Sequence, residues 1–355
     1  MKPESIKVLV CDLHKRTSGV STTIRSQIPL LTQNLDIAFV AYRDHKDCCA
    51  ISLKKALTIC QSPLPKNVPF RIWHARRNNE MIWGLIFKYV FRCEIKLLFT
   101  SAAKRRHSWF PRKLIHSMDK IIATTKEAAS YVPNVDCVIG HGVDETVFKP
   151  ANNKAELKQT LLIQAKVNVA IIGRVRPEKG TDVFINSMLD VFKKHNNIDA
   201  YIFGLVANKH KKFATELKHK IKQQGLTERF NWMGVVDIHK MPLYQSCMDV
   251  TVAPAKYEGY GMVPLEAMAC ANAVIATDTG AYKVMIKQGE TGFIIQNEAQ
   301  LTRQMNTLLD EPTHLEELGK NGLKRVLKKF TLNKEVSQII GVYQSWWNNH
   351  SKGSK

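Results

Sequence analysis

The chain has 355 residues and a mass of 40.3 kDa, more than one typical hydrophobic core supports, which predicts two domains of ordinary size. With 45% hydrophobic residues it is expected to be globular, and neither a signal-peptide pattern nor a run of about twenty uncharged apolar residues occurs in it, so we expect no secretory leader and no membrane span. The formal net charge of +21 favours negatively charged partners, which include nucleic acid, anionic lipid and phosphorylated substrates.

Short apolar runs alternate with amphipathic segments over the first 145 residues. The apolar runs predict buried strands at 6–11, 37–42, 70–73, 96–100, 120–124 and 137–139. The segments between them predict helices at 24–35, 53–59, 79–91, 111–117 and 126–132. Such alternation is typical of a doubly wound parallel sheet, so residues 1–148 are expected to form a Rossmann-like domain.

Aromatic and basic residues are interleaved in part of this first domain. The stretch 71–120 holds twelve Lys or Arg residues against three acidic ones, which suits an anionic partner. The helix predicted at 79–91 is apolar nearly all round and has two interpretations. It is a buried core helix or, with Lys88 and Arg92 at its end, a helix in a lipid headgroup layer, and the second is slightly favoured.

A polar boundary from His141 to Lys158 separates the two predicted domains. After it the alternation resumes and predicts strands at 167–172, 200–203, 230–233, 250–253, 273–276 and 292–295. The second Rossmann-like domain is therefore placed at 149–330, and a central cleft is expected, with functional loops at the carboxyl ends of both sets of strands. The remaining segment, 331–355, contains a helix predicted at 333–347, which is expected to pack back on the first domain.

The loop after the strand at 167–172 combines two glycines with two cations. Gly173 permits a close backbone approach, and Arg174 and Lys179 can neutralise the oxygens of a departing nucleotide diphosphate. Gly180 then opens a helix. An ordinary strand-to-helix loop with surface cations is the alternative interpretation.

Two glutamates flank a turn that opens another helix within 257–270. Glu258 precedes the turn, Pro264 suits the first helical position, and Glu266 lies one turn inside the helix. The amides left to face an anion are those of Gly261, Met262 and Val263. Carboxylates placed this way can accept ligand hydroxyls, so the run predicts a sugar-nucleotide pocket. Taken singly, Glu266 also suits the helix dipole and Glu258 a solvated loop.

Other nucleotide and metal motifs are missing from the sequence. Gly19 precedes a predicted helix, so its amide can face a phosphate, but neither a Gly-x-Gly-x-x-Gly fingerprint nor a P-loop occurs. This argues against a dinucleotide oxidoreductase and a P-loop nucleotidase. The eight cysteines lack the spacing of metal ligands and are expected to be reduced thiols in a cytoplasmic protein.

The motifs together resemble the retaining glycosyltransferases of family four, which have the two-domain GT-B fold. The resemblance is carried by Gly173-Arg174 with Lys179-Gly180, by Glu258 and Glu266 with seven residues between them, by the run 264–269, and by the linker 141–150. It covers nearly the whole chain and implies an α/β architecture of two Rossmann-like domains that face a cleft.

The family resemblance also implies roles for these residues. Arg174 and Lys179 would hold the donor diphosphate, Glu258 would contact hydroxyls of the transferred sugar, and Glu266 would bind the ribose. Glu258, Arg174 and Lys179 are thus the predicted catalytic residues. Such enzymes use no dissociable metal, so we expect no metal and no cofactor besides the nucleotide-sugar donor, with cations and helix amides stabilising the departing diphosphate.

A narrower resemblance lies in the first domain. The segments 72–81, 99–107 and 118–124 look like those of lipopolysaccharide core mannosyltransferases, which pass mannose from GDP-mannose to the inner core built on lipid A. This implies an anionic glycolipid acceptor and a peripheral location on the cytoplasmic face of a bacterial inner membrane. Acceptor contacts in GT-B enzymes come from the first domain.

The acceptor-binding candidates are basic residues of that domain: His74, Arg76, Arg77, Lys104, Arg105 and His107. Arginines suit a carboxylate or phosphate, while a solvated basic face is the alternative. Many family members carry a histidine, within reach of the donor sugar, after the strand that here ends in Thr100 and Ser101. This chain has no histidine directly at that position, so the role of that histidine cannot be assigned to the same place. His74 and His107 are the nearest candidates, although a lone histidine is more often packed than catalytic.

The prediction is therefore a retaining, metal-independent hexosyltransferase that moves mannose from GDP-mannose to the lipopolysaccharide inner core. A transferase that uses a UDP-sugar for O-antigen or capsule is a close alternative, and a GT-B sugar-nucleotide epimerase is a more distant one. A basic nucleic-acid-binding protein would suit the pI of about 9.6. It leaves the paired glutamates unexplained, so no nucleic-acid partner is predicted.

Overall fold

The computed structural model describes residues 2–14, 19–44 and 49–353. They form two compact units: the first contains the described residues up to Gly142 together with those from Leu332, and the second is Val143–Thr331. The predicted boundary between the domains follows residue 148. Val143 already belongs to the second unit, where its amide donates a 2.8 Å hydrogen bond to the carbonyl of Phe330.

The first unit contains a parallel sheet in the order β2-β1-β3-β4-β5-β6. Its strands are β1 (Val8–Asp12), β2 (Ile37–Ala41), β3 (Arg71–Ala75), β4 (Ile95–Ser101), β5 (Lys120–Ala123) and β6 (Cys137–Val138). The first three are buried at every position, as expected of parallel strands that helices cover on both faces.

The helices of the first unit are α1 (Gly19–Asn34), α2 (Leu53–Gln61), α3 (Asn78–Leu85), α4 (Trp109–His116), α5 (Lys126–Ser130) and α14 (Leu332–Gly353), with the short elements η1 (Pro3–Ser5) and η2 (Ile86–Val90). The apolar side chains of α2, α3 and α4 share one core, and those of α1 and α14 share the core on the other face of the sheet.

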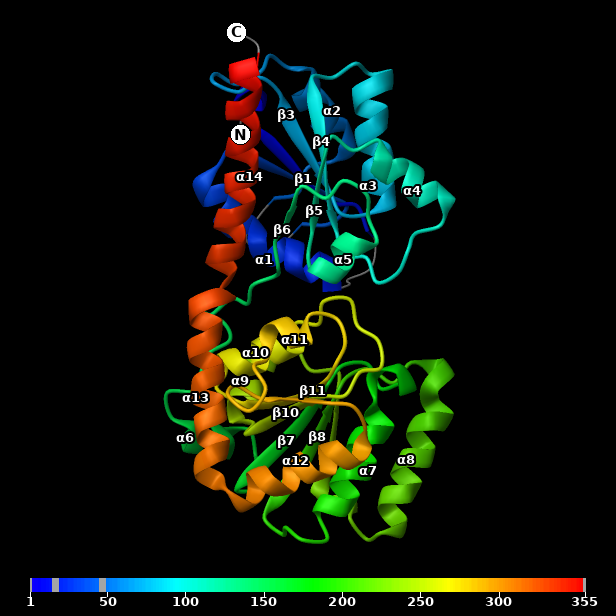
Figure 1. Cartoon of the computed structure of the whole chain (residues 1–355), viewed down its shortest axis with the longest axis vertical. Coiled ribbons are helices and arrows are strands. Elements are labelled where there is room, and N and C mark those ends of the chain that lie inside the picture. The colour runs from blue at the N-terminus through cyan, green and yellow to red at the C-terminus, as the bar shows by residue number, and fades with distance from the viewer. Residues whose placement is uncertain (1, 15–18, 45–48, 354–355) are drawn as a thin grey trace. The chain divides into compact units, whose positions relative to one another are not determined.

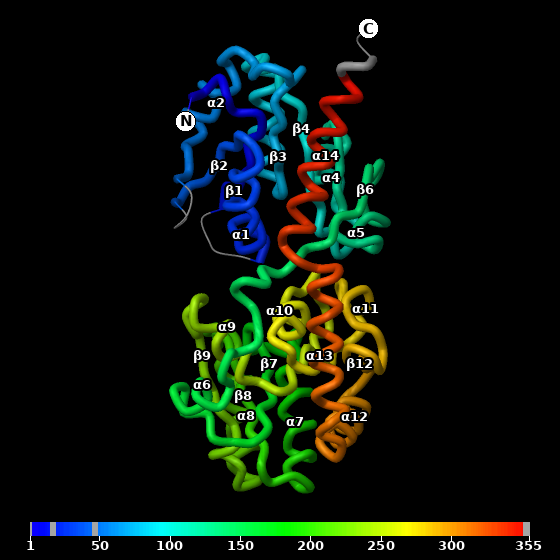
Figure 2. Tube along the Cα trace, turned by 90° about the vertical axis from the view of Figure 1, so that its left-hand side faces the viewer, coloured from blue at the N-terminus to red at the C-terminus, as the bar shows by residue number. Residues whose placement is uncertain are grey.

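The last helix of the chain is part of the first unit. Figure 1 shows α14, in red, beside the blue and cyan strands, and Figure 2 shows it from another side. Ile339 and Tyr343 are buried in the same core as Val8 of β1, and the Trp347 indole donates a 3.0 Å hydrogen bond to the carbonyl of Phe70. The sheet thus gains a cover from a segment far away in sequence.

The segment predicted as a helix at 79–91 is mainly a core element. Met81 and Phe87 are buried, and Gly84 lies so close to Trp73 that an added Cβ would stand 2.7 Å from its ring. Only the end of the segment is open, where Tyr89 and Val90 are exposed. The slightly favoured headgroup-layer interpretation is therefore wrong for the body of this helix.

The second unit contains a parallel sheet in the order β12-β11-β10-β7-β8-β9. Its strands are β7 (Val167–Ile172), β8 (Ile198–Phe203), β9 (Phe230–Gly234), β10 (Val250–Ala253), β11 (Ala273–Thr277) and β12 (Phe293–Ile295). Its helices are α6 (Lys154–Thr160), α7 (Thr181–Val191), α8 (Lys211–Gln223), α9 (Met241–Cys247), α10 (Val263–Ala269), α11 (Tyr282–Met285), α12 (Glu298–Asp310) and α13 (Pro312–Lys329), with η3 (Pro177–Lys179), η4 (Asn208–His210) and η5 (Thr227–Arg229).

Both sheets are doubly wound, which confirms the predicted fold class. In each, the strand order reverses once: between β1 and β3 in the first unit and between β10 and β7 in the second. The loops that leave the two strands at such a point diverge and open a crevice at the carboxyl ends, where ligands of this architecture bind. Among the helices in the described part of the chain, none is long and apolar enough to cross a bilayer.

Candidate functional site

The second unit brings the predicted donor-binding motifs together at its strand-order reversal. The loop with Gly173 and Lys179 follows β7, and the loop with Glu258 and Gly261 follows β10. The two strands are hydrogen-bonded neighbours, so both loops leave the same edge of the sheet side by side. The four residues therefore lie at the crevice that the topology predicts.

Gly173 sits under the side chain of Lys179. Its φ of +146° favours glycine, and an added Cβ would meet the Lys179 stem at 3.6 Å. Gly204, directly after β8, comes closer still, because an added Cβ there would stand 1.9 Å from the Gly173 carbonyl oxygen. Glycines at these two strand ends let the loops approach one another and let the lysine fold back across the edge of the sheet.

Lys179 and Glu258 form an ion pair across the crevice of the second unit. Their side chains are 22% and 16% exposed, so both charges are partly withdrawn from water and still reachable. The Glu258 amide donates a 3.1 Å hydrogen bond to the Thr279 hydroxyl, and the Gly259 amide donates one of the same length to the Glu258 carboxylate. The first bond fixes the backbone of Glu258, and the second, together with the ion pair, orients its carboxylate.

The phenol of Tyr282 links the two predicted glutamates. Gly261, at φ +82°, passes so close to this ring that an added Cβ would lie 2.3 Å from it. Burial raises the pKa of Tyr282, and the charges of Glu258 and Glu266 raise it further. Both carboxylates therefore lie within electrostatic reach of the same buried ring, although seven residues separate them in the sequence.

Glu266 is the most perturbed carboxyl group of this site. Burial raises its pKa from 4.5 to about 7, and the neighbouring Gln245 side chain lowers it in part. Gln245 is itself fully buried, and neither its amide oxygen nor its amide nitrogen has a hydrogen-bond partner among the described residues. The Glu266 side chain is itself partly exposed, so a carboxyl group with a raised pKa is reachable here beside a buried amide, which suits a ligand that supplies hydroxyl groups.

We expect the raised pKa of Glu266 to make the stability of the protein fall with rising pH. The folded state binds this proton more tightly than the unfolded chain, so the stabilisation is complete below about pH 4.5 and is lost as the pH rises to about 7, on the order of 3 kcal/mol in all. Glu266→Gln should remove this part of the dependence. Denaturant unfolding of both proteins across that range checks it, and parallel profiles would contradict the assignment.

The other predicted donor residues of the second unit lie in the same two loops or at the start of α10. Arg174 follows Gly173, and its side chain is exposed. The amides of Gly261, Met262 and Val263 donate no hydrogen bond to any described residue. Gly19 is the first residue of α1, where an added Cβ would meet nothing within 4 Å; the preceding residue, Ser18, lies outside the described residues. Their contacts with a donor stay predictions.

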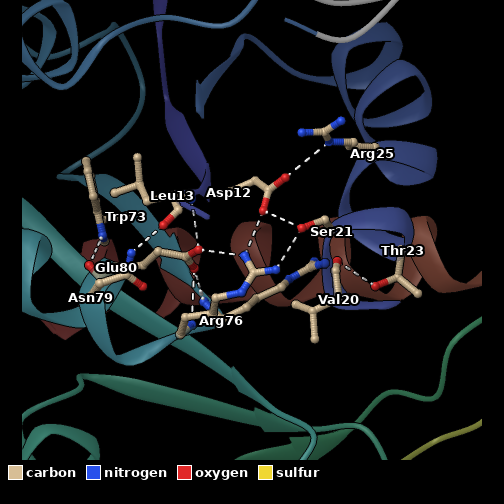
Figure 3. Close-up of polar contacts among 11 residues, drawn as sticks. Asp12, Leu13, Val20, Ser21, Thr23, Arg25, Trp73, Arg76, Asn79 and Glu80 are labelled. Carbon is tan, nitrogen blue, oxygen red and sulfur yellow. Dashed lines mark hydrogen bonds and ion pairs between the residues drawn. The ribbon is translucent and has the colours of Figure 1, made fainter. Parts of the chain in front are cut away.

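The first unit has a second polar site at its own strand-order reversal. Asp12 ends β1 and is 1% exposed. Its carboxylate accepts hydrogen bonds from Ser21 at 2.9 Å, Arg25 at 3.1 Å and Arg77 at 2.7 Å (Figure 3). With Glu80, these residues form what we call the Asp12–Glu80 network, and it joins the loops that follow β1 and β3.

Glu80 organises the backbone of this network. It is fully buried, and it accepts hydrogen bonds from the amides of Leu13 at 3.1 Å, Arg76 at 2.7 Å and Arg77 at 3.1 Å (Figure 3). The Arg77 guanidinium also donates to Glu80 at 3.0 Å. Since Arg77 bridges two carboxylates, its guanidinium is used to join the two loops, which favours a structural role over its predicted contact with the acceptor.

Arg76 is a buried cation of the first unit with unsatisfied donors. It is 8% exposed, and its Nη2 donates a 2.6 Å hydrogen bond to Gln27. Its Nε and Nη1 are buried without a partner among the described residues. Burial lowers the pKa of this guanidinium, and the Glu335 carboxylate opposes the shift. Buried charged donors without acceptors are costly, so the position suits an incoming anion.

The prediction that His74 contacts the acceptor is wrong. His74 is fully buried, and its ring nitrogens hydrogen-bond with Tyr343 at 2.6 Å and Thr100 at 2.7 Å. Burial, with Arg76 nearby, holds its pKa well below the usual value. The ring is therefore a neutral link between β3, β4 and α14 and has no nitrogen left for a substrate.

The remaining acceptor candidates lie in the loop between β4 and α4. Lys104 and Arg105 are exposed, and His107 is partly buried. Burial lowers the pKa of His107, with a further contribution from Arg105, and its Nε2 has no partner among the described residues. Their contacts with an acceptor stay predictions.

Several residues of the two sites were not identified by sequence reasoning: Asp12, Gln27, Glu80, Gln245, Thr279 and Tyr282. Asp12 carried a usable signal, because it is an acidic residue at the end of an apolar strand. The others depend on contacts between residues far apart in the chain, for which the sequence offers no pattern.

Residues 152–325 match the family model described as "Glycosyl transferases group 1". Over 96% of its length the chain is 34% identical to the lipopolysaccharide core biosynthesis mannosyltransferase LpcC of Rhizobium leguminosarum bv. viciae, of which 96% is covered. It is 33% identical over 96% of its length to LpsB of Rhizobium meliloti, which bears the same description, and 97% of that protein is covered.

Solved structures are similar as well. The C-terminal domain of a group 1 glycosyl transferase (LpcC) from Francisella tularensis is 31% identical over 54% of this chain and 99% of that domain, with a TM-score of 0.51. The structure of Anabaena HepE in complex with UDP and glucose matches 96% of this chain and all of that one with a TM-score of 0.78. At 16% identity, the similarity to HepE shows a shared fold and nothing more.

Proposed function

The chain belongs to the group 1 glycosyltransferases, and from that membership we propose that it is a retaining mannosyltransferase that moves mannose from GDP-mannose to the inner core of lipopolysaccharide. The two core mannosyltransferases that it resembles over nearly their whole length support this substrate class. The ion pair of Lys179 and Glu258 at the strand-order reversal of the second unit is the observation that carries the assignment of the site.

The donor would bind at the second unit. The Lys179 ammonium would exchange part of its bond with Glu258 for the donor diphosphate, where Arg174 from the same loop adds a second positive charge. Glu258, whose backbone amide donates to the Thr279 hydroxyl, would then accept hydrogen bonds from hydroxyls of the mannose through its carboxylate. Glu266, which has a raised pKa and is partly exposed, would bind the ribose hydroxyls.

Charge development explains how these residues would speed the reaction. As the bond from mannose to the diphosphate breaks, negative charge grows on the leaving oxygens and positive charge on the sugar. Fixed cations in a partly buried site stabilise the first charge more in the transition state than in the ground state. We propose that the leaving phosphate accepts the proton of the attacking hydroxyl on the same face of the sugar. Retention then needs neither a metal ion nor a separate protein base.

The acceptor would bind at the first unit. Arg76 lies just below the surface with two guanidinium nitrogens unsatisfied, and a change of rotamer would bring it to a carboxylate or phosphate of the core sugar region. The Asp12–Glu80 network would keep the two loops around it in place. An anionic glycolipid acceptor implies that the protein works as a peripheral protein at the cytoplasmic face of the inner membrane.

A nucleotide screen tests the donor. GDP should stabilise the protein selectively over UDP and ADP in thermal unfolding, because a ligand at about one hundred times its Kd adds about 2.7 kcal/mol to the folded state. A transfer assay with GDP-mannose and a lipid-free core oligosaccharide should then yield mannoside with the donor's anomeric configuration. Stabilisation by UDP alone would favour the UDP-sugar alternative, and inversion at the anomeric carbon would contradict the proposed mechanism.

A further inference from the structure

The start of α4 exposes two aromatic side chains in the first unit. Trp109 is 75% exposed and Phe110 is 45% exposed, and their rings pack edge to face with centroids 5.7 Å apart. The other end of the helix anchors it, because Leu114 and Ile115 are buried in the core. The aromatic pair is thus held away from the core by a helix that is fixed in position, at a cost in exposed apolar surface.

A basic pocket is built in part on the same helix, α4. It has a volume of about 290 Å³ and is lined by Arg106, Arg112 and His116, together with residues 130–133 at the end of α5. Neither arginine forms an ion pair with a described residue. Two guanidinium groups converging on an open pocket without a carboxylate are suited to a phosphate group.

The charged residues in the sequence around the pocket arginines are all positive, histidines aside. Residues 102–118 contain five Lys or Arg and no acidic residue. The cations therefore repel one another unless an anion is present, and the nearest acidic group in sequence, Asp119, already pairs with Lys88 at 2.7 Å. Positive charge next to exposed Trp and Phe is the combination that binds the interface of an anionic bilayer.

We propose that this docking surface, which comprises Trp109, Phe110, Arg106, Arg112 and His116, holds the protein on an anionic phospholipid bilayer. The pocket takes the phosphate of a lipid headgroup, and the two aromatic rings enter the boundary between headgroups and acyl chains. The proposal rests on the proposed function, since it names the surface that presents the first unit to a membrane-embedded acceptor.

The exposed apolar residues favour lipid over nucleic acid as the partner. α3 packs against α4 and continues into η2. Val90, the last residue of η2, is 70% exposed. An aliphatic side chain cannot stack on a base, whereas it does contribute to binding in a bilayer interface. Single-stranded nucleic acid is therefore the competing occupant that the experiment must exclude.

Vesicle sedimentation of the full chain tests the proposal. Wild-type protein should bind vesicles of phosphatidylglycerol mixed with phosphatidylcholine and not vesicles of phosphatidylcholine alone. Arg106→Ala with Arg112→Ala should weaken binding about 25-fold, since each basic residue near an anionic surface contributes about fivefold. Trp109→Ser with Phe110→Ser should weaken it about tenfold or more, and the blue shift of tryptophan fluorescence on vesicles should be lost in Trp109→Phe.

A charge-matched variant is the control. Lys54 and Lys55 are exposed on α2, which packs on β2, the edge strand farthest from β6. Lys54→Ala with Lys55→Ala removes the same net charge and should leave vesicle binding within about twofold. Equal binding by wild type and both docking-surface variants would overturn the proposal, as would an equal loss in the α2 control. Tighter binding to single-stranded DNA than to the mixed vesicles would also overturn it.

The same variants separate this proposal from the proposed function. With a lipid-free core oligosaccharide, the docking-surface variants should transfer mannose at the wild-type rate, and only transfer to acceptor embedded in vesicles should fall. If the wild type does not transfer mannose to the lipid-free acceptor, the proposed function fails. If it does and the variants bind vesicles normally, the docking surface alone fails.

Discussion

Replacing Lys179 with alanine is expected to lower kcat for mannosyl transfer about thousandfold, the upper range for loss of one fixed group that stabilises a developing negative charge. The ammonium lies above Gly173 and against Glu258, where the donor diphosphate is proposed to depart. Steady-state kinetics with GDP-mannose at saturating acceptor would measure the effect. Normal turnover in the purified, folded variant would show that the donor site has been placed wrongly.

Companion variants separate charge from structure, because Lys179→Ala also leaves the partly buried Glu258 without its ion-pair partner. Glu258→Ala should nearly abolish transfer as well, since it removes the proposed acceptor of sugar hydroxyl groups. The double variant should lose less transition-state stabilisation, in free energy, than the two single variants together, since residues in contact do not act additively. Unfolding midpoints of all three variants within a few degrees of the wild type would confine the effect to catalysis.

Replacing Arg76 with alanine is expected to raise the KM for the acceptor about tenfold to a hundredfold, which corresponds to about 1.5–3 kcal/mol for hydrogen bonds to a charged group. Two of its guanidinium nitrogens have no partner in the described structure, so little internal bonding is lost with the side chain. The KM for GDP-mannose should stay within about twofold, because the donor is proposed to bind the other unit.

Arg76→Lys tests the geometry at the same position. It keeps the positive charge and most of the buried stem but loses the planar fork, so acceptor KM should lie between those of the wild type and the alanine variant. Unfolding curves of both variants check that the Asp12–Glu80 network is intact. An acceptor concentration dependence that is unchanged in Arg76→Ala would remove this residue from the acceptor site.

The donor loops were predictable because their signals are local. A glycine at a strand end, a nearby cation and a proline at a helix start each act within a few residues. The positions of Gly173, Lys179 and Pro264 were therefore enough to predict the two loops and the start of the helix. The structure adds that Tyr282 lies near both Glu258 and Glu266. That proximity depends on how the loop after β11 folds back, which no spacing in the chain indicates.

The prediction that His74 contacts the acceptor was wrong for a different reason. The alternation of β3 places His74 on one face of the sheet, and the sequence alone does not tell whether that face is open or covered. α14 covers it, and Tyr343 of that helix takes one ring nitrogen. Arg77 is comparable, since its two carboxylate partners include Asp12 from the end of another strand. Long-range pairing decided both cases.

The sequence by itself determined two doubly wound sheets, the loops that carry the donor motifs and the basic character of the first unit, because periodicity, glycines and charge act over short distances along the chain. The tertiary structure decided which of those side chains are free to meet a ligand. Burial and partners depend on segments such as α14 and the first strand, which return from far away in the sequence. Two nitrogens of Arg76 are thereby left unsatisfied while Arg77 and His74 are paired, although all three were predicted from the sequence to contact the acceptor.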